Sequence, residues 1–196
     1  MATVAILAGG AATRMGLDKA EISIAGIPMV ELVVAETRRL DADVVLVGGP
    51  PRAGIPVLDD LRPGRRGPLA GLEAALVRGG GPVVLVAVDQ PYVRAETLEG
   101  LLALDGDAVV PVDAGHPQVT CAVYRRTCLP AVQALLDDAD GANLRGVLAR
   151  VETTRVEEAT WRGWGEDGRS WFSVDDPIRL DEALRRFGAP RLRSLP

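Results

Sequence analysis

Hydrophobic residues in this chain alternate between short continuous runs and longer stretches with helical spacing. The continuous runs predict strands, because a strand buried on both faces does not need a polar residue at every second position. These runs are 3–8, 44–47, 83–88, 108–112 and 119–124, with a weaker one at 152–157. Apolar residues three or four positions apart predict helices at 29–40, 69–77, 97–104, 129–136 and 176–187, with a shorter helix within 141–150.

The order of these elements predicts the fold class. Continuous hydrophobic strands that alternate with helices are typical of a parallel sheet covered by helices on both faces. The sequence therefore predicts an α/β protein of three layers with a mostly parallel, Rossmann-like sheet. We find no internal repeat and no long linker, so we expect one domain over 1–189 and a C-terminal tail over 190–196.

Composition narrows the class of protein. A chain of 196 residues with 47% hydrophobic and 25% charged residues is typical of a soluble globular domain. The formal net charge of -5 argues against a nucleic-acid or membrane-surface partner. The first strand begins without a basic leader, and no apolar run reaches the ~20 residues that span a bilayer. We therefore expect a cytoplasmic protein. Cys121 and Cys128 lack metal-site spacing and are expected to be buried thiols.

The loop after the first strand carries the one lysine of the chain. Lys19 ends the glycine-rich run LAGGAATRMGLDK of residues 7–19, whereas the other 21 basic residues are arginines. Backbone N–H groups of such a loop can face an anion, and an ammonium group can reach a terminal phosphate. Because ligands of parallel sheets bind beyond the carboxyl ends of the strands, this loop predicts a phosphate site. The run matches neither GxxxxGK[ST] nor GxGxxG.

This run is similar to the LAGGxSxRMGxDK signature of the molybdenum cofactor guanylyltransferases, with Ala12 in place of the serine. Two later segments resemble motifs of the same family: GPLAG at 67–71, and VDQP at 88–91, which is similar to its CDxP. The resemblance covers most of the chain, and its strong motifs lie in the first half. It implies the nucleotide-diphospho-sugar transferase fold.

The activity implied by the resemblance is transfer of GMP from GTP to the terminal phosphate of molybdenum-bound molybdopterin, with release of pyrophosphate. Mg²⁺ is the implied cofactor, GTP and molybdopterin are the implied ligands, and molybdoenzyme or chaperone proteins are candidate partners. The chemistry requires positioning and charge neutralisation more than covalent catalysis. We expect Arg14 and Lys19 to stabilise the departing pyrophosphate, because a guanidinium fork and an ammonium group both suit phosphate oxygens.

The other predicted nucleotide-binding residues lie at the end of the first apolar strand and in the loop after it, or shortly before the GPLAG segment. Gly9 and Gly10 would let the backbone approach the nucleotide. By resemblance, Leu7 and Ala8 line the guanine and ribose side together with Gly9. Asp60 matches an acidic nucleotide-binding position, and a carboxylate is chemically suited to guanine's N1–H and exocyclic amine.

Two aspartates are candidates for binding Mg²⁺. Asp89 follows the run 83–88, where a carboxylate can share a hard cation with phosphates and also contribute to the nucleotide site. Asp175 lies in the late segment SVDDP of residues 173–177, where the family has Asn-x-Asn-Thr-Pro. Asp175 is a candidate second ligand in place of Asn. Alternatively, Asp175 or Asp176 caps the helix that follows.

Departures from the family pattern leave two alternative functions open. Gly49 stands where the family has Asn, and the late segment is closer to that of related cytidylyltransferases, so the alternative is a transferase that uses CTP or another phosphorylated acceptor. LAGG and GPLAG favour guanine. A second alternative is a non-catalytic nucleotide-binding or cofactor-binding module, because Ala12 replaces the signature serine. Arg14, Lys19 and Asp89 argue against that alternative.

The histidine and the tryptophans also permit two interpretations. His116 lies in a His-Pro pair, and we favour a turn or packing role, because a phosphate nucleophile is already ionised and needs no general base. Trp161, Trp164 and Trp171 could stack on a pterin, but tryptophans in a weakly patterned segment more often cover a small core.

Overall fold

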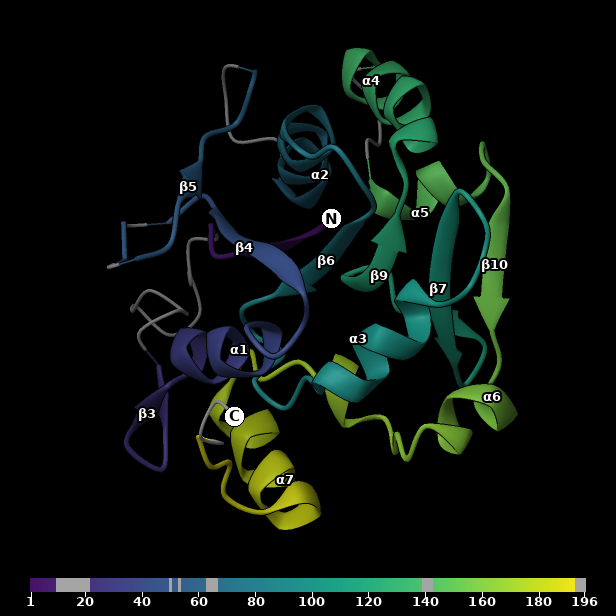
Figure 1. Ribbon diagram of the computed structural model, residues 1–196. Helices are drawn as coiled ribbons and strands as arrows, with labels where there is room; N and C mark the ends of the chain where they lie inside the picture. Colours follow the sequence, from purple (N-terminus) through teal and green to yellow (C-terminus); the bar gives the residue numbers. More distant parts are fainter. Residues whose placement is uncertain (10–21, 50, 53, 63–66, 139–142, 193–196) are drawn as a thin grey trace.

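The computed structural model describes residues 1–9, 22–49, 51–52, 54–62, 67–138 and 143–192 (Figure 1). Over these residues the main sheet has the strand order β10-β7-β9-β6-β1-β4-β5, and β8 pairs with β7. Within that order β9 is antiparallel to both neighbours, and the other six strands share one direction. The strands are β1 (Ala2–Leu7), β4 (Ala42–Val47), β5 (Val57–Leu58), β6 (Val83–Ala87), β7 (Ala108–Asp113), β8 (His116–Pro117), β9 (Cys121–Tyr124) and β10 (Thr153–Val156).

Helices cover both faces of this sheet, as Figure 1 shows. One buried cluster joins alternate strand residues to α1 (Met29–Thr37), α3 (Ala95–Leu102) and α6 (Glu158–Gly163). The other joins the intervening strand residues to α2 (Gly67–Arg78), α4 (Leu129–Asp137) and α5 (Leu144–Leu148). In β1, for example, Val4 and Ile6 belong to the first cluster and Ala5 to the second. The predicted three-layer arrangement with a mostly parallel sheet is therefore confirmed.

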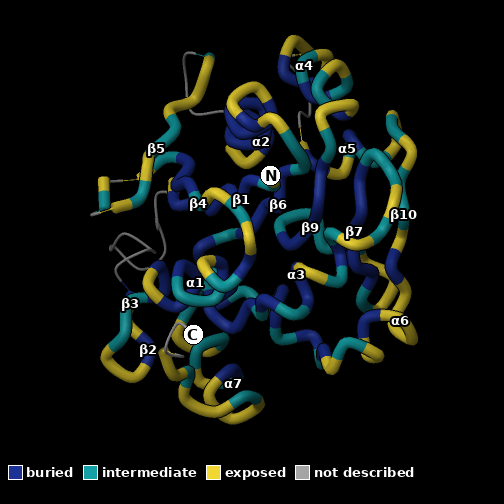
Figure 2. The backbone as a smooth tube through the Cα atoms, viewed as in Figure 1, coloured by how far each residue is buried: buried dark blue, intermediate teal, exposed yellow. Residues whose placement is uncertain are grey.

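The strands β1, β6, β7 and β9 are buried over most of their length because both faces of the sheet are covered there (Figure 2). This explains why their sequences are continuously apolar rather than alternating. Each predicted strand and helix is present, with ends shifted by a few residues: the first helix ends at Thr37 and the second begins at Gly67. Both cysteines are buried and unpaired, and burial raises the pKa of Cys128 to about 11.

A third apolar cluster lies beside α1, away from the two sheet faces. It joins the hairpin of β2 (Ser23–Ile24) and β3 (Ile27–Pro28) to Met29 and to the C-terminal helix α7 (Pro177–Phe187). Figure 1 shows α7 below α1 and next to β3. The buried members of this third cluster are Ile22, Ile24, Met29, Leu32, Tyr92, Phe172, Val174 and Ala183.

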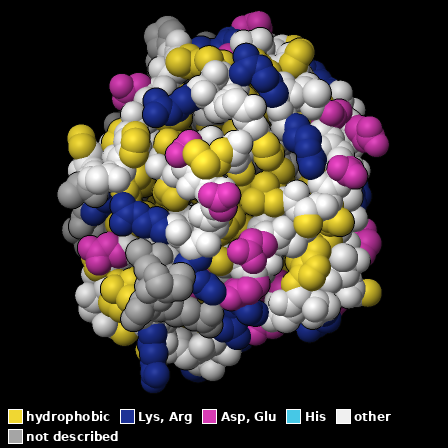
Figure 3. Space-filling view, in the orientation of Figure 1, with side chains coloured by type: hydrophobic (Ala, Val, Ile, Leu, Met, Phe, Trp, Pro, Cys, Tyr) yellow, Lys and Arg dark blue, Asp and Glu magenta, His cyan; other side chains and the backbone are white. Residues whose placement is uncertain are grey.

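The surface is mixed in charge, and Figure 3 shows basic and acidic side chains interspersed around apolar ones on the face it draws. Ion pairs between neighbouring elements, such as Arg39 with Glu96 at 3.0 Å, account for part of this pattern. In the described part of the chain, no helix is both long enough and apolar enough to cross a membrane.

Candidate functional site

The carboxyl ends of the central strands meet at one edge of the sheet. Leu7 at the end of β1 is in register with Val47 of β4 and Ala87 of β6. The sheet-like hydrogen bonds continue past the strands: the N–H groups of Ala8 and Gly9 donate to the Val47 carbonyl at 3.0 and 3.1 Å. The Val88 N–H donates to the Leu7 carbonyl at 3.1 Å. The loops that carry Gly9 and Asp89 therefore leave the sheet side by side.

Glycines let the loops after β1 and β4 pack backbone against backbone. A Cβ added to Gly48 would lie 2.9 Å from the Cα of Gly9, and one added to Gly49 would lie 2.9 Å from the Ala8 carbonyl oxygen. Real Cβ atoms do not approach that closely, and Gly48 also has a φ of +68°. The Gly49 position, where the resembled family carries Asn, thus has no room for a side chain unless the first loop shifts.

A third glycine brings helix α2 onto the same edge. A Cβ on Gly71 would lie 2.8 Å from Leu7 Cδ2 and from Val47 Cγ1, so α2 rests directly on the ends of β1 and β4. At the other end of α2, Gly79 lies near Thr3 at the start of β1. The helix therefore points its N-terminus toward the loops, where backbone N–H groups and the helix dipole favour an anion.

Asp89 and Asp175, the two predicted metal ligands, are brought together by a main-chain contact. The Val174 N–H donates to the Asp89 carbonyl at 2.7 Å, which places the segment with Asp175 against the end of β6. The cap of α7 is Asp176, whose side chain accepts from the Arg179 N–H at 2.7 Å. Of the two capping alternatives, Asp176 is correct, and capping does not account for Asp175.

Gln90, within the VDQP segment, fixes the loop that presents Asp89. Its side chain is buried; Oε1 accepts from the Ala87 N–H at 3.1 Å, and Nε2 donates to Thr120 Oγ1 at 3.1 Å. The loop is thereby tied to the residue before β9. Sequence reasoning did not single out Gln90; the available signal was a polar amide between a buried strand and a proline.

Asp60 lies beyond β5 at the same edge and is exposed. Its loop is anchored to α2 by Arg62, whose Nε and Nη2 donate to the two carboxylate oxygens of Glu73, both at 2.9 Å. Glu73 is buried, and Arg62 also pairs with Asp137. These hydrogen bonds, first those to Glu73, raise the pKa of Arg62. The Arg62–Glu73 pair was not anticipated from the sequence, because its two members occur in separate elements.

The three tryptophans serve the core of the fold. Trp161 donates from Nε1 to the Val112 carbonyl at 3.0 Å and packs edge-on against Trp171, with ring centroids 5.1 Å apart. Trp164 packs against Gly100 of α3. The core interpretation is confirmed for all three, since they belong to or pack on the first sheet cluster. His116 is exposed on β8, in a hairpin that turns at Ala114 and Gly115, in agreement with a turn role.

Gly10, Arg14 and Lys19 lie outside the described residues. Leu7, Ala8, Gly9, Asp60, Asp89 and Asp175 are described, and all lie at or just beyond the carboxyl ends of strands or against the end of β6. In the described part of the chain, no group of three or more His, Cys, Asp or Glu residues could hold a metal ion.

Residues 4–156 match the family model of the MobA-like NTP transferase domain, which spans most of the chain. The chain belongs to this family. A protein of Deinococcus radiodurans named "Probable molybdenum cofactor guanylyltransferase" is 37% identical over 192 residues, which cover 94% of each chain. "Molybdenum cofactor guanylyltransferase" of Rhodobacter capsulatus is 34% identical over 155 residues, covering 72% of this chain and 78% of the relative.

A solved structure that is similar to this chain supports the fold. The crystal structure of molybdopterin-guanine dinucleotide biosynthesis protein A from Archaeoglobus fulgidus superimposes with a TM-score of 0.81 at 25% identity, covering 92% of this chain and 96% of that one. The expected nucleotidyltransferase fold is thus confirmed. The family model ends at Val156, so α6, α7 and Asp175 lie beyond it.

Proposed function

We propose that this protein transfers GMP from GTP to the terminal phosphate of molybdenum-bound molybdopterin and releases pyrophosphate. The observation that carries the proposal is the convergence of the loops after β1, β4 and β6 at one sheet edge, in a chain whose relatives are named guanylyltransferases. Ligands of open α/β sheets bind at such an edge, beyond the carboxyl ends of the strands.

The residues at this edge fit a role for Mg²⁺. This ion is usually held by one or two carboxylates together with substrate phosphates, and it keeps several waters. Asp89 and Asp175 supply that number of carboxylates from adjacent segments. Mg²⁺ held there would neutralise charge on the phosphates during transfer.

In this proposal, different residues of the chain contact the guanine base and the phosphates of GTP. The backbone at Leu7–Gly9 faces the nucleotide at the end of β1, where Gly9 is exposed. Asp60 accepts hydrogen bonds from guanine. Arg14 and Lys19 stabilise the pyrophosphate as it leaves. No general base is assigned, because the acceptor phosphate is ionised at neutral pH.

The experiment has a binding part and a turnover part. Melting temperatures are measured with Mg²⁺ and each of GTP, CTP, ATP and UTP, because a ligand that binds the native state raises the melting temperature. We expect the largest rise with GTP, and pyrophosphate release only when molybdenum-bound molybdopterin is added. An equal or larger rise with CTP would contradict the base assignment.

A pair of variants tests the site itself. Asp89→Asn keeps the side-chain shape and removes the charge, so turnover should be lost while the fold persists. The matched control is Asp43→Asn, an exposed aspartate near the start of β4 at the opposite edge, which should behave as wild type. Wild-type turnover in Asp89→Asn would remove this residue from the site.

A further inference from the structure

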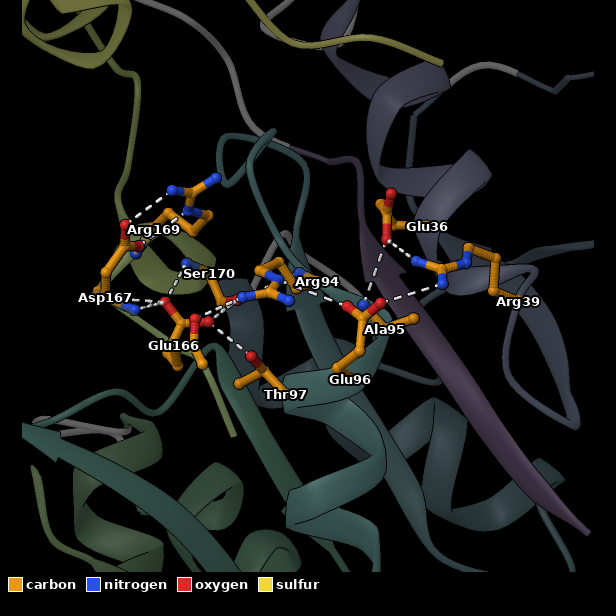
Figure 4. A network of polar contacts seen from close by, with 12 residues as sticks. Glu36, Arg39, Arg94, Ala95, Glu96, Thr97, Glu166, Asp167, Arg169 and Ser170 are labelled. Carbon is orange, nitrogen blue, oxygen red and sulfur yellow. Dashed lines mark hydrogen bonds and ion pairs between the residues drawn. The ribbon is translucent and has the colours of Figure 1, made fainter. Parts of the chain in front are cut away.

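A buried carboxylate joins the C-terminal segment to helix α3. Glu166 is 2% exposed and lies between α3 and η3 (Arg169–Trp171), as Figure 4 shows. Its Oε1 accepts from the N–H groups of Asp167, Gly168 and Ser170, at 3.0, 2.7 and 3.2 Å. Its Oε2 accepts from the hydroxyls of Thr97 and Ser170, both at 2.5 Å. We call these groups the Glu166 clamp.

Among the five hydrogen bonds of the Glu166 clamp, the bond from Thr97 is the one that joins the C-terminal segment to α3. Thr97 is fully buried on α3, whereas the other donors belong to the loop that follows α6 and to η3. A second crossing bond runs from the Arg94 N–H to Ser170 Oγ at 3.1 Å. On its other side, the start of α3 is held by Glu36 of α1, whose carboxylate accepts from the Ala95 N–H at 3.3 Å (Figure 4).

The clamp lies on the same connection that presents Asp89. The chain leaves β6 through Asp89 and enters α3 at Ala95, so Asp89 and Thr97 are two ends of one short segment. The C-terminal segment contacts the first end through the Val174 N–H and the second through Glu166. Arg94, between these two ends, also bonds Ser170 Oγ through its N–H and the Gly165 carbonyl through its guanidinium group. Attachments at both ends fix the orientation of the segment. The direction in which Asp175 leaves the segment is therefore set by both.

We propose that Glu166 is a positioning residue that holds Asp175 toward Asp89 and thereby sets the strength of Mg²⁺-dependent nucleotide binding. This inference rests on the proposed function. A carboxylate is a demanding choice for the position, because a buried charge needs several donors to offset its desolvation, and here all five donors are neutral groups. Groups that orient a metal ligand without touching the metal typically change metal affinity 10–100-fold when removed.

The test measures GTP binding by calorimetry in the presence of Mg²⁺ and in the presence of EDTA, without acceptor. The readout is the ratio of the two affinities, which a loss of fold stability alone does not change while the protein is folded. Thr97→Val removes the crossing hydroxyl and keeps the shape, and Glu166→Ala removes the whole clamp. The matched control is Thr37→Val, because Thr37 is equally buried in α1 but its hydroxyl bonds only its own helix carbonyls.

We expect Thr97→Val to reduce the Mg²⁺-dependent gain in GTP affinity on the order of tenfold, and Glu166→Ala by up to about 100-fold. Binding in EDTA and the Thr37→Val protein should match wild type. If Glu166 acts through Asp175, adding Thr97→Val to Asp175→Asn should cause no further loss. Should Glu166→Ala fail to fold, Thr97→Val alone decides.

Three results would overturn the inference, and they differ. A full Mg²⁺-dependent gain in Thr97→Val would refute the positioning role while leaving the proposed function intact. Absence of any Mg²⁺-dependent gain in wild type would refute the metal site of the proposed function, and the positioning role with it. Additive losses in the double variant would show that Glu166 acts on some group other than Asp175.

Discussion

The sheet core and the third cluster are built from different contacts. In the sheet core, strands are enclosed between two helix layers, and most side chains are aliphatic and fully buried. In the third cluster, aromatic rings and guanidinium groups share the packing: Arg179 lies 3.7 Å from the centroid of the Phe172 ring, and Phe172 meets Phe187 edge-on at 5.3 Å. The sheet core forms the sheet edge with the strand ends, whereas the third cluster places Asp175 at that edge.

The difference implies unequal stability. A region with few buried side chains and with partly exposed members opens locally at a lower free energy than a central sheet. Ile178 and Leu184 of α7 are exposed, and Ala183 is the fully buried residue of that helix. The candidate site thus combines a rigid part, formed by the strand ends, with the segment of Asp175, which can move away when the third cluster unfolds locally.

The largest expected effect comes from the sheet core. Leu72 of α2 is fully buried against the strands, so Leu72→Ala should lower the free energy of unfolding by about 2–5 kcal/mol through lost burial and a cavity. Urea unfolding measures this loss. GTP affinity of the folded protein should stay near wild type. A strong loss of GTP affinity at unchanged stability would contradict the division between the two regions.

An intermediate effect is expected from the third cluster. Val174→Ala removes buried methyl groups next to the contact with Asp89, and should lower the free energy of unfolding by about 1–2 kcal/mol. Unlike Leu72→Ala, it should also weaken Mg²⁺-dependent GTP binding, because it loosens the segment that carries Asp175. Calorimetry with and without Mg²⁺ measures this. Unchanged binding would mean that the third cluster does not position the site.

The smallest expected effect is on the stability of the protein at acidic pH. The Arg169 side chain, by hydrogen bonding to Asp167, lowers the pKa of that carboxyl. A lowered folded-state pKa stabilises the protein above the unfolded value of about 3.9, and this contribution is lost as pH falls through the folded pKa. Asp167→Asn should therefore flatten the decline in unfolding free energy below about pH 4 by a small amount. An unchanged pH profile from urea unfolding would exclude this contribution.

Much of the fold could be predicted because the sheet is buried on both faces. That burial makes β1, β6 and β7 continuously apolar, and the pattern can be recognised without homologues. The reversed direction of β9 could not be recognised, since an apolar run is the same in either orientation. The strands β2, β3, β5 and β8 have two residues each, too few to show any period.

The residues of the candidate site could be predicted only in part, and from strand ends and family motifs rather than from burial. Asp89 was found because it follows a strand, and Asp60 and Asp175 because their segments resemble a family. Gln90, Glu73 and Glu166 were missed, because a buried polar residue is identified by partners that occur far along the chain. Thr97 and Glu166, for example, are 69 positions apart. Sequence patterns indicate which residues are buried, whereas the hydrogen-bond partner of a buried polar residue depends on the folded structure.

The backbone contact between Gly9, Gly48 and Gly49 has one more consequence. Where two loops meet through side chains, rotamers can absorb a displacement, but here peptide touches peptide and nothing adjustable lies between. A displacement of the backbone at Ala8–Gly9 therefore pushes directly on Gly48 and Gly49. The backbone just beyond β1 and the backbone just beyond β4 are in this way mechanically coupled.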